Sequence, residues 1–154
     1  MLKEILIISA LVILGGCATP KTEPRIHSVT QIQGKGYPFG TTDQGQYLKL
    51  LHTSTLSNYA YTPENPVKAG NTDQRGSGYS IQYLNSLRGP NGEVIEYYRR
   101  GSCCPFETPN GMMGSGLLDA YVLTYKGLEK PIVIYINMYD SGQMLIPAGL
   151  TARQ

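Results

Sequence analysis

The sequence predicts a small α+β domain in which one helix packs on an antiparallel sheet of three to five strands. Three observations lead to this fold class. Helical spacing of apolar residues is clearest at one place, short runs rich in Val, Ile, Tyr and Leu recur, and 18 Gly and 10 Pro separate the elements. The chain has 154 residues, which suits one domain. A (β/α)₈ barrel, which needs about 200 residues or more, is excluded.

The helix is predicted at about residues 77–88. Ile81, Leu84 and Leu87 recur at the spacing that places side chains on one face of a helix. Gly89 and then a proline follow them. This pair predicts the stop, because glycine is favoured just past a helix end and proline cannot continue the helix.

Four strands are predicted from runs of β-branched, aliphatic and tyrosine residues. The connector 126–131 suits an antiparallel hairpin. The last strand is apolar on both faces, which indicates a central, covered position. Two prolines exclude a helix from residues 59–70. The predicted strands cover residues 47–51, 94–100, 117–125 and 132–139.

The first seventeen residues have the features of an export signal. An apolar run, 5–14, follows Lys3 and is about half as long as a membrane-spanning helix. Residues 14–17 (Leu-Gly-Gly-Cys) resemble the lipobox of bacterial lipoproteins, in which the signal is cleaved before the cysteine and the cysteine is acylated. Cys17 is therefore the predicted lipidation site, and two or more acyl chains give stable anchoring. By resemblance to enterobacterial lipoproteins, Ala18 in place of Asp favours the outer membrane.

These features divide the chain into three parts. Residues 1–16 are the predicted signal peptide, 17–44 the lipidated cysteine and a flexible tether, and 45–154 a single α+β envelope domain. The tether is expected because its sequence is rich in Pro, Thr, Gln and Lys and lacks sustained periodicity. The formal net charge of +2 is too small to suggest a dedicated nucleic-acid binder.

The strongest chemical signal is an adjacent cysteine pair in the segment 101–116, which has no strand or helix pattern and is predicted to be a long loop. Exported proteins favour disulfides, yet adjacent Cα atoms lie only about 3.8 Å apart, closer than disulfides prefer. Three interpretations of Cys103 and Cys104 stay open: a vicinal disulfide forming a rigid turn, two separate thiols, and a redox or soft-metal site. The other candidate binding residues of this loop are Phe106, Met112 and Met113.

Signals for catalysis are weak. The sequence contains no Gly-x-Ser-x-Gly, no His-Glu-x-x-His and no phosphate-binding glycine motif. His27 lies in the predicted tether and His52 follows the first predicted strand, so neither is favoured as a catalytic base. Asp119 and Asp140 are a weak candidate carboxylate pair. We therefore expect no cofactor, and the question of an enzyme stays open with a non-enzymatic role favoured.

Four sequence blocks stand out together: residues 61–70, 83–92, 101–106 (Gly-Ser-Cys-Cys-Pro-Phe) and 135–140. They resemble a family of small, uncharacterised bacterial lipoproteins and support the domain boundaries above. Members are sometimes labelled 2-dehydro-3-deoxyphosphooctonate aldolase. That enzyme belongs to the barrel class, which the length excludes, and it acts on cytoplasmic phosphorylated sugars. The resemblance therefore implies no catalytic residues.

The sequence thus predicts a lipid-anchored envelope protein with a binding or scaffolding role. The tyrosine-rich strands and the cysteine loop would form its contact surface, because tyrosine combines apolar area with a hydroxyl. Tyrosines half-buried on an amphipathic sheet are the equal alternative. The expected partners are the membrane, through Cys17, and another envelope protein or a cell-wall component, but no nucleic acid.

Two other functions stay open. The first is a periplasmic redox or copper-handling protein that uses the cysteine pair, with thioethers as further soft ligands. The second, weaker one is an enzyme of unknown class. The thioether ligands would come from Met112, Met113, Met138 and Met144.

Overall fold

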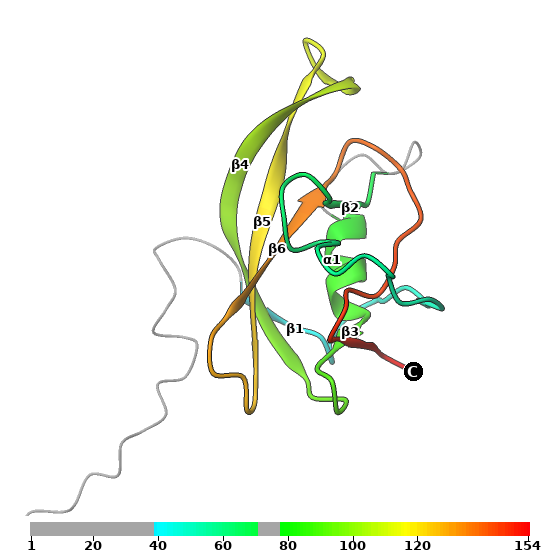
Figure 1. The fold of residues 1–154 in the computed structure, drawn as a ribbon, viewed down its shortest axis with the longest axis vertical. Coiled ribbons are helices and arrows are strands. Elements are labelled where there is room, and N and C mark those ends of the chain that lie inside the picture. The colour runs from blue at the N-terminus through cyan, green and yellow to red at the C-terminus, as the bar shows by residue number, and fades with distance from the viewer. Residues whose placement is uncertain (1–38, 71–77) are drawn as a thin grey trace, which may run out of the picture.

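The computed structural model describes residues 39–70 and 78–154. In this part of the chain, five strands form a mixed sheet in the order β1-β4-β5-β6-β2 and two more form a small sheet, β3-β7. Figure 1 shows the helix beside the larger sheet and the hairpin of β4 and β5 rising beyond it. The predicted α+β fold is confirmed. The elements are β1 (Phe39–Thr41), β2 (Val67–Lys68), α1 (Gly78–Asn85), β3 (Leu87–Arg88), β4 (Ile95–Met112), β5 (Ser115–Tyr125), β6 (Ile132–Asn137) and β7 (Thr151–Ala152).

Several predictions fall on residues outside the described ranges. These are the signal peptide, the lipidation site Cys17, His27 and most of the tether. No helix in the described part of the chain is long and apolar enough to cross a bilayer. One end of the predicted tether, 17–44, needs correction, because β1 lies inside it and pairs antiparallel with Glu96–Tyr98 of β4. Only glycine fits at position 40, where a Cβ would lie 2.5 Å from the ring of Tyr97.

The core lies between α1 and the larger sheet. Tyr83 and Leu84 of the helix are fully buried and belong to the same apolar cluster as Tyr121, Ile134 and Ile136 of the sheet. The T-shaped contact of Tyr97 with Tyr121 extends this cluster. Burial is the main cause that raises the pKa of Tyr121 to about 12, with the nearby Asp119 carboxylate adding to it. The packing of α1 therefore buries one face of the larger sheet.

Buried tyrosine hydroxyls join this core to the loop between β6 and β7 and to the end of α1. Tyr83 donates to the carbonyl of Leu145 at 2.9 Å, and Tyr97 donates to Oδ1 of Asn85 at 2.7 Å. A buried hydroxyl needs such a partner, because leaving it unpaired costs about 1–3 kcal/mol. Four tyrosines, Tyr59, Tyr83, Tyr97 and Tyr121, are core residues and are not available to a contact surface. Six other tyrosines of the described ranges are half-buried, as the alternative of an amphipathic sheet expects, and a contact-surface role for the tyrosine-rich strands stays a prediction.

The predicted elements are confirmed where their partners are close in sequence. The strands 117–125 and 132–139 appear as β5 and β6, joined by the predicted hairpin. β5 is the middle strand and β6 lies next to the edge strand β2, which pairs with it in parallel. The sheet is thus mixed, whereas the sequence predicts an antiparallel one. β6 lies inside the sheet with a neighbour on each side, as predicted, although β5 is the middle strand.

Two predicted elements differ from the structure. The helix ends at Asn85, three residues before the prediction, because Leu87 and Arg88 pair with β7 near the end of the described chain. Residues 47–51 form no ladder strand. Their alternation is nevertheless real, since Leu48 and Leu50 pack on the core while their neighbours are exposed.

Candidate functional site: the arm of β4 and β5

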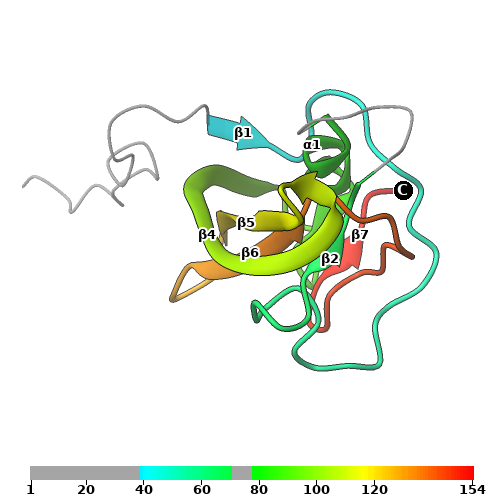
Figure 2. The same cartoon turned by 90° about the horizontal axis from the view of Figure 1, so that it is seen from above.

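The segment 101–116 is not the loop that the sequence predicts. β4 runs without interruption from Ile95 to Met112 and pairs antiparallel with β5. We call the outer part of this hairpin, residues 99–119, the arm. In Figure 2, β4 curves around β5 along the arm.

Three register shifts explain why the sequence hides this strand. Arg100 and Cys104 are extra residues without a partner on β5, and the strand also bulges at residues 108–111. Each extra residue changes which face the following side chains occupy and increases the twist of the strand. A two-residue alternation therefore does not survive in the sequence, although residues 101–107 pair with β5 except at Cys104.

The two cysteines form one of these shifts. Cys103 pairs with Leu118, and Cys104 is the extra residue, with φ of +57°. Their sulfurs are bonded to each other, with the Cα atoms 3.7 Å apart. Of the three interpretations, the structure has the vicinal disulfide, inside a strand rather than in a loop. Both residues are half-buried, and bonded sulfurs are not thiolate ligands for a metal.

At the base of the arm, Arg99 forms an ion pair with Asp119. The distance from Arg99 Nη2 to Asp119 Oδ1 is 2.6 Å, and the side chains are 30% and 2% exposed. Ser102 donates to the same Oδ1 at 2.9 Å and also accepts from Arg99. The other carboxylate oxygen, Oδ2, is buried and has no hydrogen-bond partner. At the base of the arm, Arg99 and Ser102 thus bind the same oxygen of a buried, charged carboxylate.

Near the tip, Asp140 clamps the arm to the turn after β6. Its Oδ1 accepts hydrogen bonds from Thr108 Oγ1 and from Asn110 Nδ2, the latter at 2.9 Å, and its Oδ2 accepts from Asn137 Nδ2 at 2.9 Å. The hydrogen bond from Thr108 is the largest cause that lowers the pKa of Asp140, with Asn110, Asn137 and the charge of Lys68 acting in the same direction. The bulge at 108–111 therefore supplies the contacts that hold the arm in place.

An aromatic contact adds to this clamp. Phe106 of the arm meets Tyr139 edge to face, with 5.9 Å between ring centroids. The two rings lie over Gly116, where a Cβ would come within 2.8 Å of Tyr139 and 3.0 Å of Phe106. Phe106, a candidate binding residue, therefore helps to fix the arm to the body, and Gly116 leaves room for that contact.

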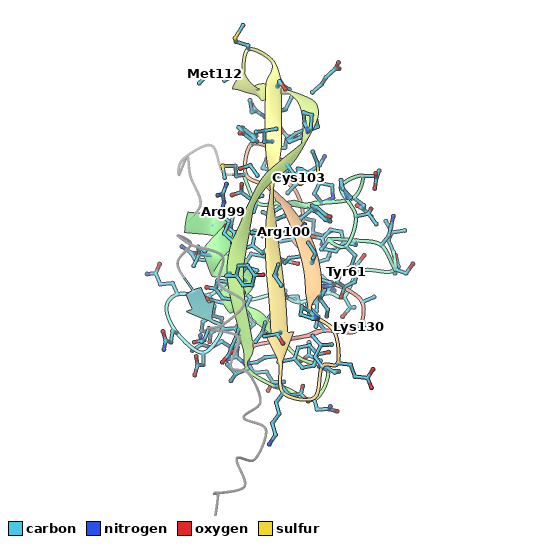
Figure 3. The ribbon with its side chains drawn as sticks, turned by 90° about the vertical axis from the view of Figure 1, so that its left-hand side faces the viewer. Tyr61, Arg99, Arg100, Cys103, Met112 and Lys130 are labelled. Atoms are coloured by element: carbon cyan, nitrogen blue, oxygen red, sulfur yellow. A yellow bond between two sulfur atoms is a disulfide. The ribbon has the colours of Figure 1, made fainter. Side chains whose placement is uncertain are left out.

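The tip presents two methionines to solvent. Met112 is 84% exposed and Met113 is 98% exposed, and Leu117 on the neighbouring strand is 44% exposed. Met113 and Gly114 form the two-residue turn, with φ of +54° and +78°. In Figure 3, Met112 lies at the end of the arm, well beyond Cys103. The fold thus separates the methionine tip from the disulfide, which the copper hypothesis places together.

The remaining predicted residues do not converge. Asp119 and Asp140 share no hydrogen-bond partner, so the weak candidate pair does not appear as one site. His52 is exposed. In the described ranges, no three His, Cys, Asp or Glu side chains group as a metal site. Sequence reasoning missed the residues that hold the arm, because their partners are distant in sequence and no local motif marks them: Arg99, Ser102, Thr108, Asn110 and Asn137.

Comparisons of the chain with protein-family models, with curated proteins and with solved structures each gave no match.

Proposed function

We propose that this protein is a lipid-anchored envelope protein whose arm binds another envelope protein. The observation that carries the proposal is the exposure of Met112 and Met113 at the end of a clamped hairpin. Large apolar side chains that are this exposed bury little surface against the protein's own core, so they do not stabilise the fold through the hydrophobic effect. Methionine is flexible and polarisable, which suits it to an apolar groove on a partner.

The clamp supports a binding role because it reduces the cost of association. A free hairpin would lose conformational entropy when it docks, whereas an arm held by Asp140 and by the Phe106–Tyr139 contact is already ordered. Met113 adds a second argument. It occupies a left-handed backbone conformation that costs a residue other than glycine about 1 kcal/mol or more, and it makes no core contact in return.

A photoreactive side chain placed at Met113 in the full-length protein tests the proposal in intact envelopes. We expect it to crosslink to one protein partner, and we expect the same replacement at Leu56 to give no such product. Leu56 is a matched control because it is apolar, 56% exposed and outside the arm. Crosslinks to lipid alone, or the same products from both positions, would contradict the proposal.

A recovery experiment adds a quantitative measure. The amount of the crosslinked partner that is recovered with the purified chain is compared between variants. We expect the double substitution Met112→Ser and Met113→Asn to abolish this recovery, and Leu56→Ser to leave it unchanged. Unchanged recovery with the tip variant would reject the arm as the binding element.

A thiol–disulfide role is the second candidate. It is favoured by the bond between two half-buried cysteines that follow Arg99 and Arg100. A dithiol would reduce the pair by transferring two electrons and two protons, so that Cys103 and Cys104 become thiols and the dithiol becomes a disulfide. Alkylation followed by intact-mass measurement tests this. A mass gain of two alkyl groups after mild dithiol treatment supports the role, and no gain contradicts it.

A further inference from the structure

A pocket of about 450 Å³ lies on the side of the protein formed by the small sheet β3-β7, outside the arm. Arg88 of β3 pairs with Thr151 of β7, and the hydroxyl of Thr151 donates to the carbonyl of Gly89 at 2.7 Å. This contact fixes the turn at 89–92 beside the sheet. The pocket is lined by Arg88, Pro90, Gly92, Thr151, Ala152, Arg153 and Gln154.

Two arginines of this pocket converge on one neutral acceptor. Nη1 of Arg88 lies 2.6 Å from the carbonyl oxygen of Thr42, and Nη1 of Arg153 lies 3.2 Å from the same oxygen. The guanidinium of Arg153 also lies 4.3 Å from the ring centroid of Tyr47, which holds it in place. In the described part of the chain, the Nε and Nη2 groups of both arginines have no hydrogen-bond acceptor.

The positive charge here is not balanced by an ion pair. Within residues 39–70 and 78–154, the ion pair that forms joins Arg99 to Asp119, and neither residue lines this pocket. Burial is the main cause that lowers the pKa of Arg88, and the charge of Arg153 lowers it further, whereas Asp43 opposes this effect. Two cations that share a carbonyl oxygen repel each other, and an anion placed between them would remove that cost.

We propose that this pocket, which we call the arginine pocket, binds a phosphate group. Planar guanidinium forks match the oxygen atoms of phosphate, and each arginine keeps donors that its protein contacts do not use. A phosphate monoester carries close to two negative charges at neutral pH, which matches two arginines. The group comes either from a soluble phosphate or from a lipid headgroup, because the chemistry recognised is the same.

Titration with inorganic phosphate tests this proposal on the full chain in uncharged maltoside micelles. Backbone amide resonances of Gly92, Thr151 and Ala152 should shift in a saturable way with sodium phosphate, and not with sodium chloride at equal ionic strength. Arg153→Ala should weaken binding about tenfold or more, because one charge-assisted contact is lost. Arg100→Ala is the matched control, since it removes an exposed arginine outside the pocket and should leave binding unchanged.

Further arms of the experiment separate the sources and guard against misfolding. Adding phosphatidic acid to the micelles should reproduce the shifts if a headgroup reaches the pocket, whereas shifts with soluble phosphate alone assign a soluble ligand. Arg153→Lys keeps the positive charge but loses the planar guanidinium. We expect its affinity for phosphate to lie between that of the unsubstituted protein and that of Arg153→Ala, with unchanged resonances of the core residues. Equal shifts with chloride, or equal weakening by Arg153→Ala and Arg100→Ala, would overturn the proposal. Neither result bears on the arm, so the two proposals fail independently.

Discussion

The ion pair of Arg99 and Asp119 shows how one buried charge controls its surroundings at the residue scale. Asp119 is 2% exposed, and one of its oxygens already lacks a partner. Removing the guanidinium would leave the hydroxyl of Ser102 as the donor to Oδ1 of this carboxylate. A buried charge that loses its partner is costly, because desolvation is no longer offset by attraction.

We therefore expect Arg99→Ala to lower the free energy of unfolding by about 3 kcal/mol, at the lower end for a buried pair because Arg99 is partly exposed. Urea denaturation monitored by tyrosine fluorescence measures this change. The neighbouring exposed residue provides the control, and Arg100→Ala should change stability by no more than about 0.5 kcal/mol. Equal effects of the two substitutions would show that the pair adds nothing specific.

Met113 offers the opposite case, a residue whose replacement should stabilise the protein. Met113→Asn places an Asn-Gly pair in a turn where both residues have positive φ, the sequence that such turns prefer. We expect the free energy of unfolding to rise by about 0.5–1 kcal/mol. Partner crosslinking from a photoreactive side chain at Met112 should fall at the same time. A loss of stability would mean that the methionine side chain supports the fold.

At the scale of elements, the clamp decides whether the arm stays attached to the body. Asp140→Asn replaces one acceptor oxygen with a donor, which must then face Asn137 on one side or Thr108 and Asn110 on the other. We expect a loss of about 2 kcal/mol at pH 7, the usual size of a hydrogen bond to a charged group. Faster amide exchange in residues 106–116 should accompany it. Glu107→Gln, an exposed carboxylate on the same arm, is the control.

The pH dependence of the clamp follows from the direction of its pKa shift. Because folding lowers the pKa of Asp140, its contribution is fully present above the unfolded pKa of about 4. It is lost as the pH falls through the lower, folded value. The stability difference between the protein and Asp140→Asn should therefore shrink as the pH is lowered below about 4, measured by urea denaturation at each pH. A constant difference down to pH 2 would exclude the carboxylate as the cause.

The disulfide acts on the same element. Reduction frees Cys104, which as an extra residue with positive φ gains conformations once the bond to Cys103 is broken. We expect dithiothreitol to speed amide exchange in residues 101–106 and to leave α1 unchanged, as measured by mass spectrometry. Exchange that rises equally in α1 would indicate that the disulfide supports the whole domain rather than the arm.

For the whole molecule, sequence reasoning succeeded where the physics is local. The β5–β6 hairpin, the approximate position of α1 and the α+β class all follow from spacing and turn residues. It failed where partners are distant. β1, β3 and β7 are two or three residues long and exist only through their pairing, and β4 is hidden by its register shifts.

The same distinction applies to the candidate site. The sequence pointed to Cys103, Cys104, Phe106, Met112 and Met113, and all five lie on the arm. The contacts of Arg99 and the partners of Asp119 and Asp140 could not be inferred from the sequence. Those contacts depend on which side chains the curved hairpin brings to the body.

The irregularities of β4 also bear on self-association. β1 covers only Glu96–Tyr98, so from Arg99 outward no other described strand pairs with that edge of β4. A long, regular open edge is a template for joining sheets between molecules, and therefore for aggregation. Here the bulges at Arg100 and Cys104 interrupt the edge, and Pro105 and Pro109 have no N–H to offer. The bulges and prolines that hide this strand in the sequence thus let the protein expose the methionines of the tip without also exposing a long, regular strand edge.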